Sequence, residues 1–290
     1  MRLNQKLSKL VKLHRTHRFT RFRTAISPFS IGRYVRYRTQ PPLIVIVGSP
    51  HKVGSTWLFQ MLETLLKPQY DFEGLVIPRS MRTRGYTDTF TSASAANFVS
   101  SSKGRWLFKT HKNIHPDILP ICKFVSVHRD LRDACVSMVH FGTHLPTEAG
   151  GYQQEIKQLP FKERLHFELE RDYNLERAEY WWNFPATARV HYEHLKNDCP
   201  AELHSVARAL NIENDYCAKQ YKHVAERHDF SRVSQRAPGK EVSSAFLRKG
   251  IVGDWREKFE EEHIQHFKTA LNGRWNKLLI QMGYEEVVDW

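Results

Sequence analysis

The segment 52–56, Lys-Val-Gly-Ser-Thr, carries residues that can bind an anion. It follows an apolar run and opens a helical pattern, so its main-chain N–H groups and the positive end of the helix dipole would face a ligand. Lys52 adds a full charge, and Ser55 and Thr56 add hydroxyl groups. An ATP-binding P-loop would place the lysine directly after the second glycine, which is not the case here. The segment predicts a phosphate or sulfate site of another kind, with a tight turn bearing an exposed lysine as the alternative.

Two later segments have a similar character. Arg129 follows the apolar stretch 124–127, and Ser137 comes eight residues later, about two turns along a predicted helix. The segment 248–255, Arg-Lys-Gly-Ile-Val-Gly-Asp-Trp, places two cations beside glycines, which allow close main-chain approach. Arginine and lysine supply charge-assisted hydrogen bonds to phosphate. Taken singly, each segment could be a solvated basic turn.

The cysteines and histidines show no metal-binding pattern. The sixteen histidines form no H-E-x-x-H motif, and the four cysteines form no C-x-x-C pair. We therefore expect no metal site, and free thiols in a reducing compartment. The cysteines in question are Cys122, Cys135, Cys199 and Cys217.

Strand and helix patterns alternate along the chain. Short apolar runs at 43–47, 106–109, 124–127 and 189–192 predict strands, and helical patterns occupy 55–66, 161–182 and most of the chain from 200 onward. The composition of residues 82–103, rich in Thr, Ser, Gly and Ala, predicts a loop with a short helix. The alternation predicts an α/β fold with a central parallel sheet covered by helices on both faces, in a single domain spanning 41–290.

The net charge of +13 is concentrated at one end of the chain. Residues 1–40 hold eleven of the 44 Lys and Arg residues and no acid, so residues 41–290 carry a net charge of only +2. We interpret 1–40 as a basic N-terminal extension, whose residues 2–14 could form an amphipathic helix. It could contact an anionic membrane surface or nucleic acid, serve as a targeting segment, or be solvated. The nearly neutral body argues against nucleic acid as the main partner. Without a long apolar run or a secretory signal, we expect a cytoplasmic protein.

Together, these segments resemble the sulfotransferases that use 3′-phosphoadenosine 5′-phosphosulfate (PAPS). Residues 52–57 are similar to the K-S-G-T-T-W loop of that family, and 248–255 match its R-K-G-x-x-G-D-W signature. Lys109-Thr110-His111 matches the K-T-H in which the histidine is the catalytic base, and Arg129 with Ser137 resembles the 3′-phosphate site. Tyr192 and Phe230 fall where aromatic residues border the adenine. The matches follow the family order over residues 43–259.

The resemblance implies a P-loop-like sulfotransferase fold and transfer of a sulfuryl group from PAPS to a hydroxyl or amine, without a metal. His111, Lys52 and Lys109 would be catalytic. The residues implied to bind PAPS or its product 3′-phosphoadenosine 5′-phosphate (PAP) are Lys52, Val53, Gly54, Ser55, Thr56, Trp57, Arg129, Ser137, Tyr192, Phe230, Arg248, Lys249 and Gly250. A small molecule or a glycan would be the acceptor.

The sequence also departs from this family. His51 separates Pro50 from Lys52, which is closer to carbohydrate sulfotransferases, and the dimerisation motif expected after Lys258-Phe259 is absent. His51, His128 and His140 are interpreted as structural or exposed. The alternative functions are a P-loop-type nucleotide or small-molecule kinase, which would require Mg²⁺, and a nucleic-acid- or membrane-binding protein that acts through its basic arm.

Overall fold

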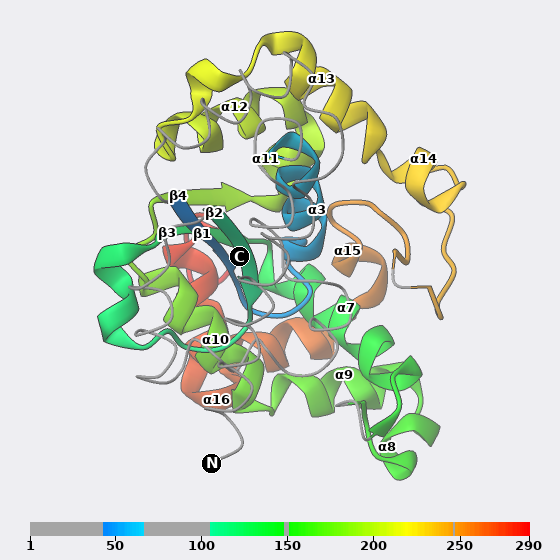
Figure 1. Ribbon diagram of the computed structural model, residues 1–290. Helices are drawn as coiled ribbons and strands as arrows, with labels where there is room; N and C mark the ends of the chain where they lie inside the picture. Colours follow the sequence, from blue (N-terminus) through cyan, green and yellow to red (C-terminus); the bar gives the residue numbers. More distant parts are fainter. Residues whose placement is uncertain (1–42, 67–104, 148–150, 246) are drawn as a thin grey trace, which may run out of the picture.

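A four-stranded parallel sheet forms the centre of the protein (Figure 1). The computed structural model describes residues 43–66, 105–147, 151–245 and 247–290. The strands are β1 (Leu43–Gly48), β2 (Arg105–Thr110), β3 (Lys123–His128) and β4 (Ala188–His191), in the spatial order β2-β1-β3-β4. All four predicted strands are therefore present, each within one or two residues of its predicted ends.

The strand order places a topological switch at β1. The chain passes from β1 to β2 on one side and then to β3 on the other side. In the register, Gly48 of β1 lies opposite Thr110 of β2 and Ser126 of β3. The carboxyl ends of the three strands thus meet at one edge of the sheet, which is where open α/β sheets bind ligands.

Helices cover both faces of the sheet, as the sequence predicts. The helical elements are α3 (Ser55–Leu66), η3 (Pro116–Ile121), α7 (Leu131–His144), α8 (Gln154–Gln158), α9 (Phe161–Leu169), α10 (Asp172–Asn183), α11 (Tyr192–Asn197), α12 (Cys199–Ala209), η5 (Glu213–Asp215), α13 (Ala218–Arg227), α14 (Phe230–Ser234), α15 (Trp255–Lys258) and α16 (Glu261–Gln281). The last of these is interrupted at 270–273 by non-helical backbone.

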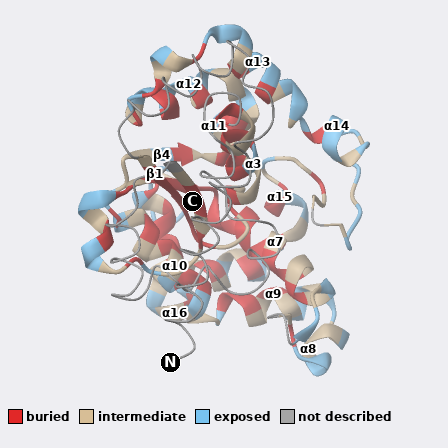
Figure 2. Ribbon diagram, viewed as in Figure 1, coloured by how far each residue is buried: buried red, intermediate tan, exposed pale blue. Residues whose placement is uncertain are grey.

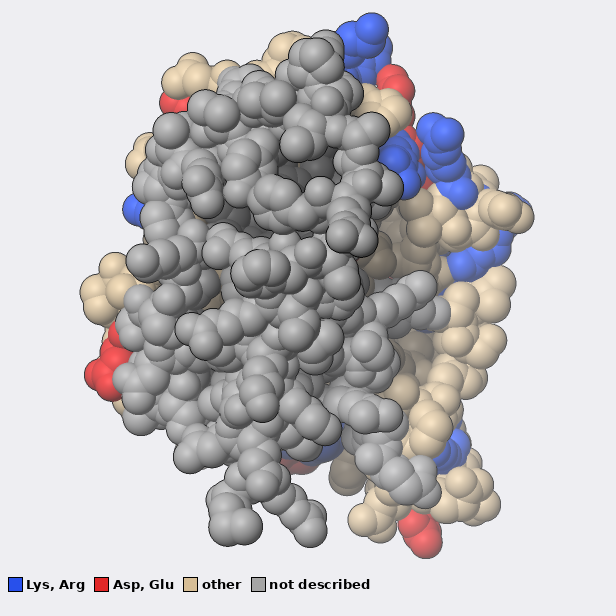
Figure 3. All heavy atoms as spheres, in the orientation of Figure 1, with Lys and Arg blue, Asp and Glu red and all other residues tan. Residues whose placement is uncertain are grey.

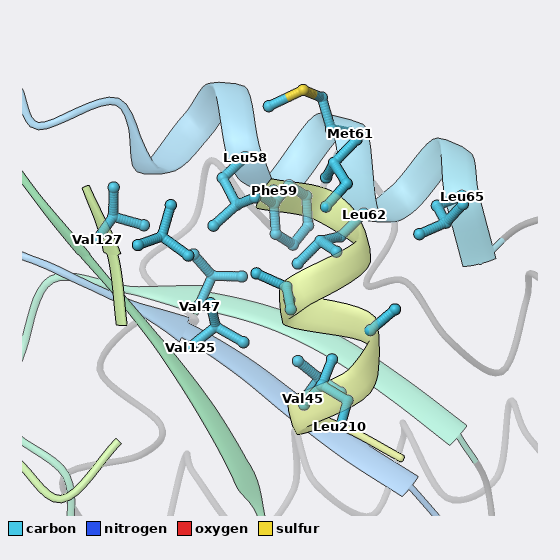
Figure 4. Close-up of a cluster of buried hydrophobic side chains, with 14 of the residues drawn as sticks. Val45, Val47, Leu58, Phe59, Met61, Leu62, Leu65, Val125, Val127 and Leu210 are labelled. Atoms are coloured by element: carbon cyan, nitrogen blue, oxygen red, sulfur yellow. The ribbon is translucent and has the colours of Figure 1, made fainter. Parts of the chain in front are cut away.

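Side chains alternate between two apolar layers along the strands. Val45 and Val47 of β1 pack against α3 and α12 on one face, in the cluster drawn in Figure 4. Ile44 and Ile46 point to the other face, where Trp181 of α10 lies. Because β1 is buried on both faces, its sequence is a continuous apolar run and does not alternate. Figure 2 shows the buried residues gathered around the sheet, with exposed residues on the outer faces of α13 and α14.

The predicted helix over 161–182 is wrong as a single element. The structure has two helices, α9 and α10, separated at Glu170 and Arg171, and Arg171 is extended with ψ of 113°. No glycine or proline marks this break. The buried carboxylate of Glu168 accepts hydrogen bonds from Tyr152 and Asn174, and these tertiary contacts lie on either side of the interruption. Such contacts override helical propensity and leave no periodic signal in the sequence.

Several expectations lie outside the described residues: the basic extension 1–40 with its amphipathic helix 2–14, and the loop at 82–103. Among the residues that the structure does describe, no helix is long and apolar enough to cross a membrane. In the view of Figure 3, exposed lysines and arginines stand along the upper right rim, where Figure 1 places α13 and α14.

Candidate active site

The loop 49–54 joins β1 to α3 at the carboxyl edge of the sheet. Two of its residues have left-handed backbone, Gly54 with φ of 92° and Lys52 with φ of 63°. A Cβ atom on residue 54 would lie 2.6 Å from the ring of Tyr192, so this position requires glycine for space as well as for conformation. The left-handed conformation of Lys52 costs of order 1–3 kcal/mol, and such strain is typical of functional loops.

The ring of His111, directly after β2, is oriented by two hydrogen bonds. Nδ1 lies 2.9 Å from the main-chain oxygen of Ser49, and Nε2 lies 2.7 Å from Nζ of Lys109. A carbonyl oxygen can only accept and an ammonium group can only donate, so the partners assign the proton to Nδ1 and the lone pair to Nε2. Burial, together with the charge of Lys109, lowers the pKa of His111 well below its usual 6.5. A neutral imidazole with its basic nitrogen beside an ammonium group is the result.

Two lysines with lowered pKa values belong to the site. Burial lowers the pKa of Lys109 to about 8. Burial and the neighbouring cations Arg129 and Lys109 lower the pKa of Lys52 to about 8 as well. The Lys52 ammonium lies 4.3 Å from the centre of the Phe141 ring on α7. Mutual repulsion between buried cations destabilises their charged forms, and an anion bound between them would reverse this effect.

Arg129, at the end of β3, connects the loop to the segment 248–255. Its guanidinium donates hydrogen bonds to the main-chain oxygen of Ile251 at 2.9 Å and to Asp133 at 3.1 Å, and it lies 4.4 Å from the centre of the Tyr192 ring. Asp133 in turn accepts hydrogen bonds from the main-chain N–H groups of Gly253 and Trp255. This buried carboxylate therefore fastens the glycine-containing segment to α7.

The cations of segment 248–255 are paired with carboxylates. Arg248 forms ion pairs with Glu241 at 3.0 Å and with Asp254. Lys249 is buried and contacts Asp254 at 2.6 Å and Glu257 at 2.5 Å, and these carboxylates raise the pKa of Lys249 despite its burial. The segment is thus preorganised by its own acids.

Aromatic rings close the side of the site next to α3. Trp57 packs edge-to-face on Tyr192 with 5.8 Å between ring centres, and its indole N–H donates to the main-chain oxygen of His228 at 2.7 Å. Phe230 is buried beside Gly250, where a Cβ atom would come within 2.3 Å of the ring. Gly250 also has a φ of 67°. Glycine at both positions therefore lets the rings of Tyr192 and Phe230 pack directly on the main chain.

The structure brings together most, but not all, of the side chains named from the sequence. Lys109 contacts His111, Arg129 contacts Tyr192 and the main-chain oxygen of Lys52, and Lys52 is close enough to Arg129 and Lys109 for their charges to lower its pKa. Ser55 and Thr56 begin α3, and Ser137 is half-buried on α7. The side chain of Val53 instead packs into the core, with 1% of its surface exposed, so this residue can only offer its main chain to a ligand.

Three neighbours of the site were not singled out as functional from the sequence. The ring of His51 lies 4.1 Å from the ring of His111 between centres, although the sequence suggested a structural or exposed role. Arg177 of α10 donates from Nε to the main-chain oxygen of His111 at 3.1 Å. Asp133 holds the segment 248–255. The unusual position of His51 between Pro50 and Lys52 was a sequence signal that could have drawn attention to it. Arg177 lies 66 residues from its partner His111, and no pattern in the sequence connects the two.

A cavity of about 10 Å³ lies behind the loop, lined by Pro50, His51, Val53, Glu168 and Asn174 among others. This volume is about that of one water molecule, so the cavity cannot hold a substrate. The candidate site is therefore the carboxyl edge of the sheet, where the loop 49–54 and His111 lie.

Comparison with known proteins agrees with this geometry. The family model for the sulfotransferase domain matches residues 42–281. Sulfotransferase 1 family member D1 of Rattus norvegicus is 22% identical over 276 residues, covering 81% of this chain and 86% of the rat protein. Sulfotransferase 1C2 of Homo sapiens is 21% identical, covering 96% of this chain and 95% of the human protein.

Solved structures show the same fold. Mouse sulfotransferase SULT7A1 complexed with PAP superposes with a TM-score of 0.60 at 18% identity, covering 82% of this chain and 85% of that one. Retinol dehydratase, in complex with androsterone and the inactive cofactor PAP, gives a TM-score of 0.53 at 18% identity, covering 88% and 85%. The family match spans most of the chain and confirms the fold class and the resemblance found in the sequence. The chain is a sulfotransferase-family enzyme and belongs to the sulfotransferase domain family.

Proposed function

We propose that this enzyme transfers the sulfuryl group of PAPS to a hydroxyl or amine of a small-molecule or glycan acceptor by in-line displacement. The sulfur–oxygen bond to the 5′-phosphate of PAPS breaks, and PAP departs with the electron pair. A new bond forms from the acceptor oxygen or nitrogen to sulfur, and the acceptor proton goes to Nε2 of His111. This reaction needs positioning and charge stabilisation, and no covalent enzyme intermediate.

Two features of the site fit a nucleotide that carries phosphates. The Nε atoms of Arg129 and Arg248 are buried and have no hydrogen-bond partner among the described residues. Buried donors of this kind are costly unless a ligand satisfies them, and phosphate oxygens are strong acceptors. The rings of Tyr192 and Phe230 pack directly on Gly54 and Gly250, and such aromatic faces are surfaces on which a flat base can stack.

Each group then has a role. Lys52, Val53, Gly54, Ser55 and Thr56 would bind the 5′-phosphosulfate through main-chain N–H groups, hydroxyls and the Lys52 charge. Arg129, Ser137, Arg248, Lys249 and Gly250 would bind the 3′-phosphate, and Trp57, Tyr192 and Phe230 would border the adenine. Lys52 and Lys109 would neutralise charge on the leaving phosphate, and His111 would be the general base.

The observation that carries the proposal is the orientation of His111. Its Nδ1–H is held by the Ser49 carbonyl, so the basic Nε2 faces Lys109 at the same sheet edge as the Lys52 loop. The test is a screen of phenols, aliphatic alcohols, amines and sugars with radiolabelled PAPS, together with calorimetric binding of PAP. Labelled product and PAP binding, both insensitive to EDTA, are expected. Failure to bind PAP, or phosphoryl transfer from ATP that requires Mg²⁺, would favour the kinase instead.

The catalytic unit is proposed to be the single domain 41–290. The family match begins at residue 42, and no residue named for the site precedes it. The basic extension 1–40 would then act outside the reaction, and contact with an anionic membrane surface suits its charge.

A further inference from the structure

Arg177 of α10 lies beside the candidate catalytic residues, and the described residues use only two of its N–H donors. Its Nε donates to the main-chain oxygen of His111 at 3.1 Å, and Nη1 donates to the main-chain oxygen of Tyr173 at 3.1 Å. An arginine has five N–H donors, so three have no partner among the residues that the structure describes. Within the described ranges, no carboxylate forms an ion pair with Arg177. Of the three acids on α10, Asp172 and Glu179 are paired with Arg274, and Glu176, directly before Arg177, is exposed and forms no ion pair with Arg177 among the described residues.

Arg177 lies at the outer end of a row of stacked rings that begins at the catalytic histidine. The ring of His51 lies 4.1 Å from that of His111 between centres, and the ring of Tyr173 lies 6.1 Å from that of His51. The Arg177 guanidinium covers the Tyr173 ring at 3.4 Å. Tyr173 is 46% exposed, so the row runs from the half-buried His111 to the surface of the protein. An acceptor must reach His111 from solvent, and the row marks one wall of such a path.

The charges along this wall are of one sign. The charged groups that perturb the buried ring of His51 are Arg177, Lys109 and Lys52, all of them cations. The nucleotide side of the site differs, because Arg129 is paired with Asp133 and Arg248 with Asp254. Among the described residues, no carboxylate forms an ion pair with Arg177 on this side of the site. Neighbouring cations bordered by low-dielectric rings attract anions.

We infer that the acceptor is itself an anion, a hydroxyl or amine compound whose carboxylate or phosphate is bound by Arg177 while its nucleophile faces His111. The inference rests on the proposed sulfuryl transfer and narrows its acceptor class. Guanidinium binds both oxyanions through paired N–H donors, so the two chemistries share one recognition group. A neutral acceptor of the same shape leaves this charge desolvated and unpaired, which is the basis of the selectivity.

The experiment measures acceptor binding to the full-length enzyme saturated with PAP, by calorimetry. One pair of probes is 4-hydroxyphenylacetate and its neutral amide, 4-hydroxyphenylacetamide, and the second pair is glucose 6-phosphate and glucose. We expect the anion to bind at least about tenfold more tightly than its neutral partner in one pair or both, as a charge-assisted hydrogen bond allows. The pair that shows the preference distinguishes a carboxylate from a phosphate ligand.

Three variants assign the preference to Arg177. Arg177→Gln should abolish the preference, and Arg177→Lys should restore part of it because the charge remains. Arg208→Gln, an exposed position on α12 that loses the same charge, should leave it unchanged. PAP affinity and thermal melting of each variant report on whether the site remains folded.

The outcomes separate this inference from the proposed function. Equal binding of both members of both pairs, no binding of either anion, or a preference that survives in Arg177→Gln would each overturn the anionic acceptor, even if PAP binds well. Absence of PAP binding by the unmodified enzyme would count against sulfuryl transfer itself.

Discussion

Nζ of Lys109 lies 2.7 Å from Nε2 of His111, the atom proposed to accept the proton of the acceptor. Lys109 lies in β2 and His111 directly follows its carboxyl end, and the residue between them, Thr110, is fully buried opposite Gly48. The β-strand alternation sends the side chains of residues 109 and 111 to the same side of the strand. In the free enzyme the ammonium group therefore occupies the basic lone pair, and an acceptor hydroxyl would have to displace it.

Replacement of His111 by alanine should lower kcat by about 10²-fold or more with a good acceptor, which is the usual contribution of a general base. The Kd for PAP should change little, because the ring contacts Lys109 and Ser49 and is not among the side chains proposed to bind the nucleotide. Steady-state kinetics and PAP calorimetry check both parts. An unchanged kcat would remove His111 from the mechanism.

The pH profile of kcat/KM should fall on the alkaline side near pH 8. Burial lowers the pKa of Lys52 and of Lys109 from 10.5 to about 8, so both lose their charge as the pH rises through that value. The acidic limb should lie well below pH 6.5, because burial depresses the pKa of His111. The profile of kcat/KM reports the free enzyme, where these values apply.

The same two lysines should make the folded protein more stable as the pH rises. Between pH 8 and 10.5 the unfolded chain binds these protons more tightly than the folded chain does, so the free energy of unfolding contributed by Lys52 and Lys109 rises with pH. Urea denaturation at pH 7.5 and 9.5, compared with the double variant Lys52→Met/Lys109→Met, measures this. Between these two pH values, the free energy of unfolding should rise less in the variant than in the unmodified protein. An equal or larger rise in the variant would show that folding does not lower the pKa values of these lysines.

The variant Arg248→Ala should weaken PAP binding by about 1.5–3 kcal/mol, the value of a hydrogen bond to a charged group. Adenosine 5′-phosphosulfate has no 3′-phosphate, so its binding should barely change. Calorimetry with the two nucleotides makes the comparison, with Arg208→Ala as a control at an exposed position. Equal losses for both nucleotides would mean that Arg248 does not read the 3′-phosphate.

A methyl group at residue 250 should destabilise the protein more than one at residue 239. Both glycines have left-handed backbone, with φ of 67° and 89°, which costs an alanine about 1–2 kcal/mol. Only at Gly250 would the new Cβ meet a ring, that of Phe230 at 2.3 Å, whereas Gly239 faces open space. Gly250→Ala should therefore lose a further ~1–3 kcal/mol by urea denaturation, together with PAP affinity. Equal losses in both variants would show that the ring moves aside freely.

Deletion of residues 1–40 should leave the Kd for PAP within about twofold, a change of roughly 0.4 kcal/mol. Any binding to anionic liposomes at low salt should disappear with the same deletion, because residues 1–40 hold eleven cations and no acid. Loss of PAP binding in a truncated protein that still melts cooperatively would assign the extension to the active site.

The sequence by itself determined the local elements and the anchor residues of the site. Buried parallel strands such as 43–48 are apolar on both faces, and a helix that starts with hydroxyls after a glycine loop has a local signature, so both could be read directly. The residues of the K-T-H and R-K-G-x-x-G-D-W segments are contiguous, and contiguous patterns are visible without a fold.

Only the tertiary structure decided how these groups face one another. The hydrogen bond from His111 to Ser49 spans 62 residues, and that from Trp255 to Asp133 spans 122. Neither contact can be predicted from the spacing of residues along the chain, because the fold of the chain brings these partners together. The buried carboxylate of Glu168 likewise joins residues on the two sides of the break between α9 and α10, and the row of side chains from His111 to Arg177 exists only once α10 packs beside the sheet edge. Periodicity and motif report on neighbours along the chain, whereas the pKa of each lysine and the tautomer of His111 are set by neighbours in space.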